Sequence, residues 1–402
     1  MITIQDIERA RARIKDSIYI SPCAHSETFS LLTGNKVFFK LENLQMSGSF
    51  KERGALNKIL TLTDAERKRG VIAASAGNHA QGVAYHATRQ GLRSTIVMPT
   101  SAPLFKVMRT REFGAEVILH GGNYDDAYEE AVRREKAEGL TFIHAFDDDA
   151  VMAGQGTIGL ELIEQNPYLD AVVVPVGGGG LVSGIAVAMK ETNPRIRIIG
   201  VQTARIPSML RALEQSKPVV LPAAGTIADG VAVRKAGERT FPTVQKYVDE
   251  IVTVDEEEIA KAILWLLERE KTVAEGAGAV GVAALLQEKT NLRDKKVAVI
   301  VTGGNIDVNV LSRIIERGLV KDGRLVRLRV RINDHPGALH KLTGRIAETH
   351  ANVLEVFHNR AFSRVALGET AVDLTLETRG SEHIDSILKS LDEAHYEHER
   401  LG

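Results

Sequence analysis

Lys51 lies in a segment whose composition suits a lysine that reacts as an amine. Residues 47–54 read Ser-Gly-Ser-Phe-Lys-Glu-Arg-Gly, and the helix-forming residues 55–58 follow them. This order places Lys51 at or just before a helix N-terminus, where the positive end of the helix dipole disfavours an ammonium. A neutral amine is the form that attacks a carbonyl carbon. The alternative is a solvated lysine in a loop, as most lysines are.

Two other segments could bind anions, and each follows an apolar run. Residues 75–82 read Ser-Ala-Gly-Asn-His-Ala-Gln-Gly, and a strand that turns into a helix through small residues leaves backbone N–H groups free for a carboxylate. The alternative there is a tight turn capped by Asn78. Residues 177–180 are four glycines, which can direct their N–H groups at one phosphate without Cβ clashes. A flexible linker is the alternative, but a linker is not expected between a buried strand and an apolar helix.

Thr302 follows the apolar run 297–301 and precedes two glycines. Open parallel sheets bind ligands at the carboxyl ends of their strands, so Thr302 could face the same crevice as the segments above. A plain turn threonine is the alternative. Residues 276–281 match a dinucleotide-binding glycine pattern, but a charged stretch precedes them instead of a strand, so they are interpreted as helix packing.

The elements that position these segments are short apolar runs alternating with helical patterns, which predicts an α/β protein with parallel sheets. The predicted strands include residues 37–41, 95–98, 116–119, 171–176, 196–201 and 297–301. Three predicted helices begin at a residue pair typical of an N-cap: Thr3 with Asp6, Thr63 with Glu66, and Asp255 with Glu258.

The pattern changes near Gly318, where residues 318–323 are interpreted as a linker. Beyond it, residues 326–332 alternate apolar side chains with arginine, which predicts a strand with one solvated face. The turn 333–337 and the following patterns predict the order βαββαβ, a small ferredoxin-like domain.

Composition excludes several classes of protein. The chain has 402 residues, 51 Lys plus Arg against 52 Asp plus Glu, and one cysteine. Two or three domains are expected at this length. The near-zero net charge provides no basic field for nucleic acid or membranes, and Cys23 alone cannot form an intrachain disulfide, which suits the cytoplasm. Neither a signal peptide nor an apolar run long enough to cross a bilayer is expected.

Residues 49–55, 75–82 and 176–181 together resemble the threonine/serine dehydratases, which are pyridoxal-phosphate enzymes of the tryptophan-synthase-β-like fold. The resemblance covers residues 1–320 and implies a catalytic domain whose smaller subdomain spans roughly residues 53–152. Residues 325–402 resemble an ACT-type domain, which senses amino acids in related enzymes.

The resemblance implies a role for each segment. Lys51 would form the Schiff base with the aldehyde of pyridoxal 5'-phosphate, and Asn78 would bond to the ring hydroxyl. The loop Gly177, Gly178, Gly179, Gly180 and Leu181 would hold the phosphate, and Thr302 would face the pyridine nitrogen. The residues implied for binding the substrate carboxylate are Ser75, Gly77, Asn78 and His79.

The implied reaction is β-elimination of L-threonine to 2-oxobutanoate and ammonia by a lyase, a threonine ammonia-lyase, with L-serine giving pyruvate in the same way. A serine dehydratase or racemase is the alternative, and a silent amino-acid sensor is a third. Ala76 stands where related racemases carry a proton-donating serine. Gln202 stands where some relatives bind a divalent cation through Glu, so no metal is expected.

In the ACT-like domain, the residues expected to respond to an effector are Asp334, Pro336, Gly337 and Asn352. The expected effector is isoleucine or valine. A homodimer or homotetramer is implied by the resemblance, since ACT-type domains usually pair.

Overall fold

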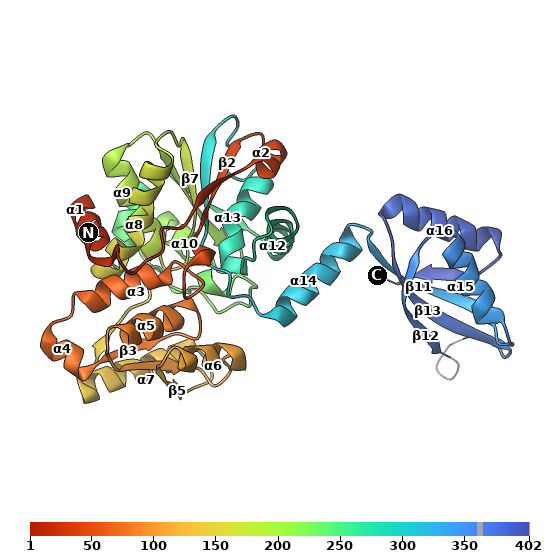
Figure 1. Ribbon diagram of the computed structural model, residues 1–402, viewed down its shortest axis with the longest axis horizontal. Helices are drawn as coiled ribbons and strands as arrows, with labels where there is room; N and C mark the ends of the chain where they lie inside the picture. The colour runs from red at the N-terminus through yellow and green to blue at the C-terminus, as the bar shows by residue number, and fades with distance from the viewer. Residues whose placement is uncertain (360–364, 402) are drawn as a thin grey trace. The chain divides into compact units, whose positions relative to one another are not determined.

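The computed structural model describes residues 1–359 and 365–401, and the chain forms two compact units, Met1–Ile306 and Asp307–Gly402 (Figure 1). The predicted boundary between residues 320 and 325 falls inside the second unit, between helix α14 (Val308–Lys321) and strand β11 (Leu325–Asn333). The linker expected from residue 318 is wrong up to Lys321, because one glycine costs a helix only about 1 kcal/mol and α14 continues through it.

The larger sheet of the first unit has six strands in the order β1-β2-β10-β7-β8-β9. All neighbours are parallel except β1 and β2. The strands are β1 (Cys23–Ser26), β2 (Lys36–Leu41), β7 (Ala171–Pro175), β8 (Arg197–Thr203), β9 (Glu250–Val254) and β10 (Lys296–Val301). Every residue of β7 is buried, as the unalternated apolar run predicted.

The smaller sheet of the first unit has four parallel strands in the order β5-β4-β3-β6. They are β3 (Val71–Ala74), β4 (Ser94–Met98), β5 (Glu116–Leu119) and β6 (Thr141–Phe142). The helices that follow or cover its strands are α3 (Lys51–Leu60), α4 (Asp64–Arg69), α5 (Asn78–Arg89), α6 (Leu104–Glu112) and α7 (Tyr124–Glu138). The predicted α/β architecture with parallel sheets is confirmed.

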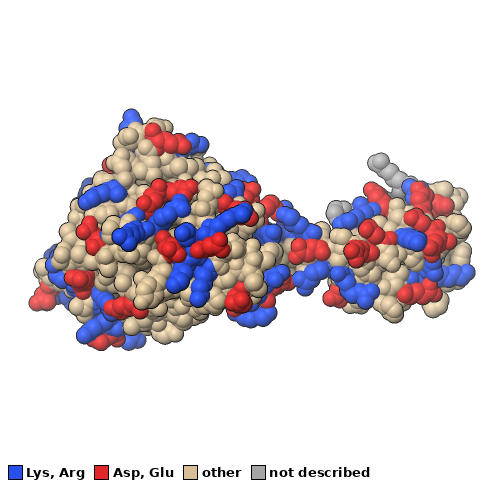
Figure 2. Space-filling model, turned by 90° about the horizontal axis from the view of Figure 1, so that it is seen from above, with Lys and Arg blue, Asp and Glu red and all other residues tan. Residues whose placement is uncertain are grey.

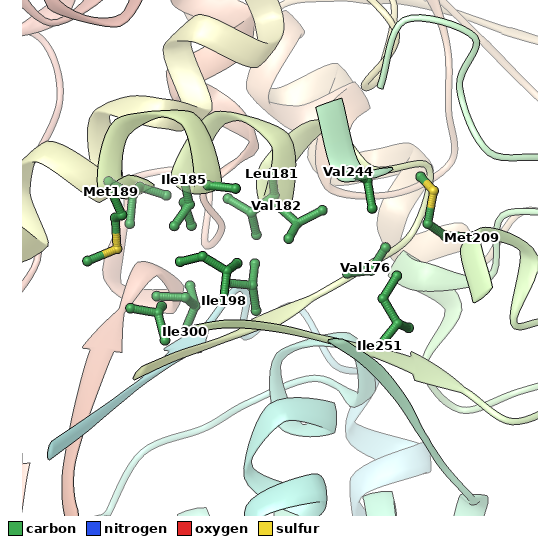
Figure 3. Packing of buried hydrophobic residues seen from close by; sticks show 14 of the residues in the cluster. Val176, Leu181, Val182, Ile185, Met189, Ile198, Met209, Val244, Ile251 and Ile300 are labelled. Carbon is green, nitrogen blue, oxygen red and sulfur yellow. The ribbon is translucent and has the colours of Figure 1, made fainter. Parts of the chain in front are cut away.

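The remaining helices of this unit include those that bury the larger sheet. They are α1 (Ile4–Ile14), α2 (Glu27–Thr33), α8 (Asp149–Gln165), α9 (Gly180–Thr192), α10 (Ser208–Glu214), α11 (Thr240–Tyr247), α12 (Glu256–Glu270) and α13 (Gly276–Leu286), with 3-10 turns η1 (Glu42–Leu44) and η2 (Asp229–Val231). Figure 3 shows side chains of α9, such as Ile185 and Met189, packed against Ile198 and Ile300 of the sheet. The capping boxes predicted at Thr3, Thr63 and Asp255 are present.

The second unit has the predicted βαββαβ order after α14. Its elements are β11, α15 (Ala338–Glu348), β12 (Asn352–Asn359), β13 (Glu369–Glu377), α16 (Ser381–Glu393) and β14 (His398–Arg400). The four strands form an antiparallel sheet in the order β12-β13-β11-β14. The apolar residues of β11 are buried against both helices, which confirms the strand with one solvated face.

Two surface properties follow from this arrangement. Among residues 1–359 and 365–401, no helix is both long and apolar enough to span a bilayer. Basic and acidic side chains are interspersed over the face of the molecule seen in Figure 2.

Close backbone contact between α8 and α9 depends on Gly184. A Cβ on this residue would lie 2.5 Å from the backbone nitrogen of Gly156 in α8, closer than real Cβ atoms approach. Because the atoms that this Cβ would meet all belong to the backbone of α8, the two helices would have to separate. The spacing of these helices matters for the site because α9 begins within the tetraglycine segment and α8 packs against α3, which begins with Lys51.

We therefore expect Gly184→Ala to lower the free energy of unfolding of the first unit by about 1–3 kcal/mol. Thermal unfolding followed by circular dichroism measures this. Gly344→Ala is the matched control, since a Cβ at this exposed helical glycine meets nothing within 4 Å. Equal melting temperatures for Gly184→Ala and the unmodified protein would contradict the proposed contact.

Candidate active site

Lys51 is the first residue of α3, as predicted, and its side chain is partly buried. Its Nζ donates a hydrogen bond to the carbonyl oxygen of Ala145 at 2.9 Å. Burial lowers the pKa of Lys51 to about 8, although the negative charge of Glu275 acts in the opposite direction. At neutral pH far more of this amine is therefore neutral than of an ordinary lysine with a pKa of 10.5. The sequence pointed to the helix dipole as the cause of this shift, whereas burial is the larger cause in the structure.

The start of α3 is held by a buried ionic network. The guanidinium of Arg53 bonds to Glu42 through Nε at 2.8 Å and to Glu161 through Nη1 at 2.5 Å. Lys40 Nζ bonds to the same Glu161 at 2.6 Å. Because each charge has a partner, this network can remain buried, and it anchors the helix turn that carries Lys51.

The tetraglycine segment forms a tight turn between β7 and α9. Gly179 has φ = +101°, a conformation that favours glycine, and a Cβ on Gly178 would lie 2.5 Å from Cζ of Phe146. The carbonyl of Gly178 accepts hydrogen bonds from Thr240 Oγ1 at 2.6 Å and from the backbone N–H of Gly237 at 3.1 Å. These two bonds hold the turn in place against residues 237–240.

The N–H groups of the turn remain available. Within the described parts of the chain, no hydrogen bond is donated by the backbone N–H groups of residues 177–181. Free N–H groups at a helix N-terminus suit a phosphate. Phe146, which packs against Gly178, follows Ala145, the acceptor of the Lys51 hydrogen bond, so the structure brings the amine and the glycine turn together.

Asn78 is the first residue of α5, and its amide lies between two side chains that the sequence analysis did not assign. Its Nδ2 donates to Glu275 Oε1 at 2.5 Å, and its Oδ1 accepts from Asn305 Nδ2 at 2.8 Å. The sequence feature that could have indicated Glu275 is its position as the acidic residue in an otherwise apolar, glycine-rich stretch, residues 274–286. Asn305 lies three residues after Thr302, in the same turn.

Glu275 is buried directly before α13, and its backbone N–H donates to Gly303. Burial first, and then the nearby charge of Asp229, raise the pKa of this carboxyl to about 7, against the opposing effects of Lys106, the Asn78 hydrogen bond and Lys51. Asp229 also forms a 2.6 Å ion pair with Lys106 of α6. The site therefore contains a second group, besides Lys51, that changes protonation near neutral pH.

Thr302 directly follows β10, as predicted, and it is buried beside the segment that leads to Lys51. Its carbonyl accepts from the backbone N–H of Phe50 at 3.0 Å, and Ser49 forms a β-bridge with Gly303. The end of β10 and the start of α3 are therefore joined through the backbone.

The predicted carboxylate-binding residues lie at the end of β3. Ser75 Oγ accepts from the N–H of Gly77 at 3.1 Å, so this N–H is occupied. The imidazole of His79 is buried and bonds through Nε2 to the carbonyl of Ile143 at 2.8 Å. Burial lowers the pKa of His79 to about 3, which keeps the ring neutral. The Nε2 side of the His79 ring is thus directed toward the residue that follows β6 and is engaged there.

Gln202 has both ends of its amide engaged. Its Nε2 donates to the carbonyl of Val176 at 3.3 Å, and its Oε1 accepts from the N–H of Leu210 at 2.9 Å. It therefore fastens the residue before the tetraglycine turn to α10. Among the described residues, no cluster of three or more His, Cys, Asp or Glu side chains could hold a metal ion.

The proposed regulatory residues lie in the second unit. Asp334, Pro336 and Gly337 line a cavity of about 280 Å³ together with His335 and His358. Asn352 does not line this cavity, and its amide donates to Glu377 at 3.1 Å. The structure therefore brings three of the four predicted residues together.

The residues of the first unit fit pyridoxal phosphate on physical grounds. The glycine turn, whose close packing leaves no room for a Cβ at Gly178, Gly179 or Gly180, offers free N–H groups to a phosphate, and a lysine of lowered pKa is available to an aldehyde. An amide lies near that lysine to bind a ring oxygen, since Asn78 and Lys51 both interact with Glu275.

Comparisons with known proteins agree with this fit. Residues 14–303 match a family model described as pyridoxal-phosphate dependent enzyme. An L-threonine ammonia-lyase of Thermotoga maritima is 52% identical over 402 residues, which is 100% of both chains.

Two solved structures share the fold. A processed threonine deaminase isoform from Solanum lycopersicum is 37% identical with a TM-score of 0.75, over 78% of this chain and 92% of that one. A serine racemase from maize is 34% identical with a TM-score of 0.75, over 79% of this chain and 98% of that one. The first unit therefore has the two-subdomain fold that the tryptophan-synthase-β resemblance implied, and the chain belongs to the family of pyridoxal-phosphate-dependent enzymes.

Proposed function

We propose that this chain is an L-threonine ammonia-lyase, which converts L-threonine to 2-oxobutanoate and ammonia by β-elimination. The single observation that carries the proposal is the partly buried amine of Lys51, with its pKa of about 8, next to the phosphate cradle of a pyridoxal-phosphate enzyme. The similarity to an L-threonine ammonia-lyase along the whole chain supports the same substrate.

Pyridoxal phosphate, when bound to the amino group of a substrate, supplies an electron sink that acidifies the substrate's Cα–H bond. Lys51 would hold the cofactor at rest and would accept the Cα proton on Nζ once the substrate amine replaces it. This step needs the neutral amine, and burial supplies it. The Lys51 ammonium would then return a proton to the β-hydroxyl, which would leave as water. Lys51 would replace the product amine on the cofactor, and the released enamine would tautomerise and hydrolyse to 2-oxobutanoate and ammonia.

The other predicted residues would bind and orient. The N–H groups of Gly177, Gly178, Gly179, Gly180 and Leu181 would hold the phosphate, Asn78 the ring oxygen and Thr302 the pyridine nitrogen. A neutral hydroxyl cannot hold that nitrogen strongly protonated, which suits elimination over reactions that need a long-lived carbanion. Ser75 and the N–H groups at the start of α5, from Gly77 to His79, would bind the substrate carboxylate, with the carboxylate replacing Ser75 Oγ at Gly77.

A racemase is the second candidate, supported by the similarity to maize serine racemase. Ala76 stands beside Ser75 in the carboxylate-binding segment, and its methyl group cannot transfer a proton to the second face of Cα. We therefore expect turnover of L-threonine to 2-oxobutanoate and of L-serine to pyruvate to exceed formation of D-serine.

Replacement of Lys51 tests the proposal directly. We expect Lys51→Ala to lower 2-oxobutanoate formation by about 10³-fold or more, because both cofactor attachment and proton transfer are lost. The measurement is oxoacid release from L-threonine with added pyridoxal phosphate. Lys68→Ala on exposed α4 is the control and should retain full activity. Undiminished turnover in Lys51→Ala, or none in the unmodified protein, would refute the proposal.

The pH dependence of cofactor attachment tests the state of the amine. Apo-protein should attach pyridoxal phosphate at a rate that rises about tenfold per pH unit below pH 8 and levels off above it, since only neutral Lys51 reacts. Stopped-flow absorbance after cofactor addition measures the rate. A midpoint near the ordinary lysine pKa of 10.5 would show that Lys51 is solvated, contrary to the structure.

The second unit would regulate the first by binding isoleucine or valine. Support comes from the cavity formed by the turn at Asp334, Pro336 and Gly337, where Gly337 has φ = +87°. Its edge strand β12 exposes Leu354, Val356 and Phe357, which suits pairing with a second copy in a homodimer or homotetramer. A cytoplasmic location is proposed from the single cysteine.

We expect Asp334→Ala and Gly337→Val to abolish the effect of isoleucine or valine on turnover and to leave basal activity within about twofold, because the active-site residues belong to the first unit. Initial rates with and without each amino acid measure the response. Asp385→Ala, at an exposed position of α16, is the control. A normal response in both cavity variants would exclude this cavity as the effector site.

A further inference from the structure

A chain of hydrogen bonds crosses the candidate active site from the turn before α3 to the residue before α13. Asn305 Nδ2 donates to the carbonyl oxygen of Ser47 and to Asn78 Oδ1, both at 2.8 Å. Asn78 Nδ2 in turn donates to Glu275 Oε1 at 2.5 Å. Ser47, Asn305, Asn78 and Glu275 are therefore linked through two side-chain amides, those of Asn305 and Asn78.

The direction of this chain is set by its first member. A backbone carbonyl can only accept, so the nitrogen of Asn305, not its oxygen, must face Ser47. The same nitrogen reaches Asn78, so the oxygen of the Asn78 amide faces Asn305 and its nitrogen faces Glu275. The orientation of an asparagine amide is usually ambiguous, and here a main-chain group determines it.

Two glycines make room for the chain. A Cβ on Gly48, which has φ = +74°, would lie 2.5 Å from Asn305 Oδ1. A Cβ on Gly303 would lie 2.5 Å from Glu275 Oε1 and 3.0 Å from Asn78 Nδ2. The backbone supports the same contacts, because Gly304 donates to Gly48 and Glu275 donates to Gly303, each at 3.0 Å. The chain is thus held in place along its length.

We infer that Asn305 and Glu275 are positioning residues that make Asn78 present an N–H group, and not its carbonyl, to the ring oxygen of the cofactor. The inference rests on the proposed function, in which Asn78 binds that oxygen. Asn78 Nδ2 carries two hydrogens, of which Glu275 takes one, so one remains for a ligand. A donor would stabilise the ionised form of the ring oxygen over its neutral form. A proton shared between that oxygen and Lys51 Nζ would then stay on Nζ.

Asn305→Asp tests the direction of the chain. A carboxylate of the same shape cannot donate to Ser47 and Asn78, so the Asn78 amide is free to rotate. We expect holoenzyme that retains the cofactor on Lys51, with its absorbance shifted from the longer-wavelength band of the ionised ring oxygen toward the shorter-wavelength band, and with about tenfold weaker cofactor binding. Spectra and equilibrium dialysis against pyridoxal phosphate measure these changes. Asn309→Asp on exposed α14 is the control and should change neither.

Variants of Glu275 test the other end and remain informative if Asn305→Asp does not fold. Glu275→Leu removes the acceptor and should cause the same spectral shift. Glu275→Gln keeps an acceptor oxygen and should restore the normal spectrum and affinity within about twofold. An equal spectral shift in Glu275→Leu and Glu275→Gln would assign the effect to the lost charge and overturn the inference. A normal spectrum in both Asn305→Asp and Glu275→Leu would also overturn it.

The outcomes separate this inference from the proposed function. Unmodified protein that neither binds pyridoxal phosphate nor turns over L-threonine would refute the proposed function. Unmodified protein that does both, together with Asn305→Asp and Glu275→Leu of normal spectrum and affinity, would refute only the positioning role.

Discussion

The chemistry proposed for this protein depends on keeping one amine out of bulk water while a carbonyl carbon can still reach it. The amine of Lys51 is partly buried at the start of α3, and burial is the largest influence that lowers its pKa to about 8. Such burial is costly for an ammonium, and the Ala145 carbonyl offsets part of the cost with a hydrogen bond. The buried network around Arg53 holds the helix turn that keeps the amine there.

The parallel sheets explain why the remaining groups meet at this amine. The segment proposed to bind the substrate follows β3 of the smaller sheet, whereas the glycine turn and Thr302 follow β7 and β10 of the larger one. Each group is therefore at the carboxyl end of a parallel strand, where open sheets place their ligands. Because the strands are buried on both faces, the segments that follow them start from fixed positions.

Close approach of backbones is the second recurring feature. Glycine at positions 178, 303 and 48 allows Phe146, Glu275 and Asn305 to lie where a Cβ would otherwise be. The glycine turn proposed to bind the phosphate and the hydrogen-bond chain through Asn78 thus share this feature. The absence of a side chain on one element creates the space for a functional contact from another.

The sequence by itself determined the α/β class, the strands that carry the site, the position of Lys51 at a helix start and the glycine turn. These depend on local patterns of apolar residues, caps and glycines, which act over a few residues. Only the tertiary structure decided that Glu275 and Asn305 flank Asn78, that the His79 ring faces Ile143 and that Asn352 lies outside the cavity at Asp334. It also decided that α14 continues through Gly318. Partners of Asn78 such as Glu275 are nearly 200 residues away in the chain, and the protonation state of a buried group depends on everything packed around it, which no local pattern encodes.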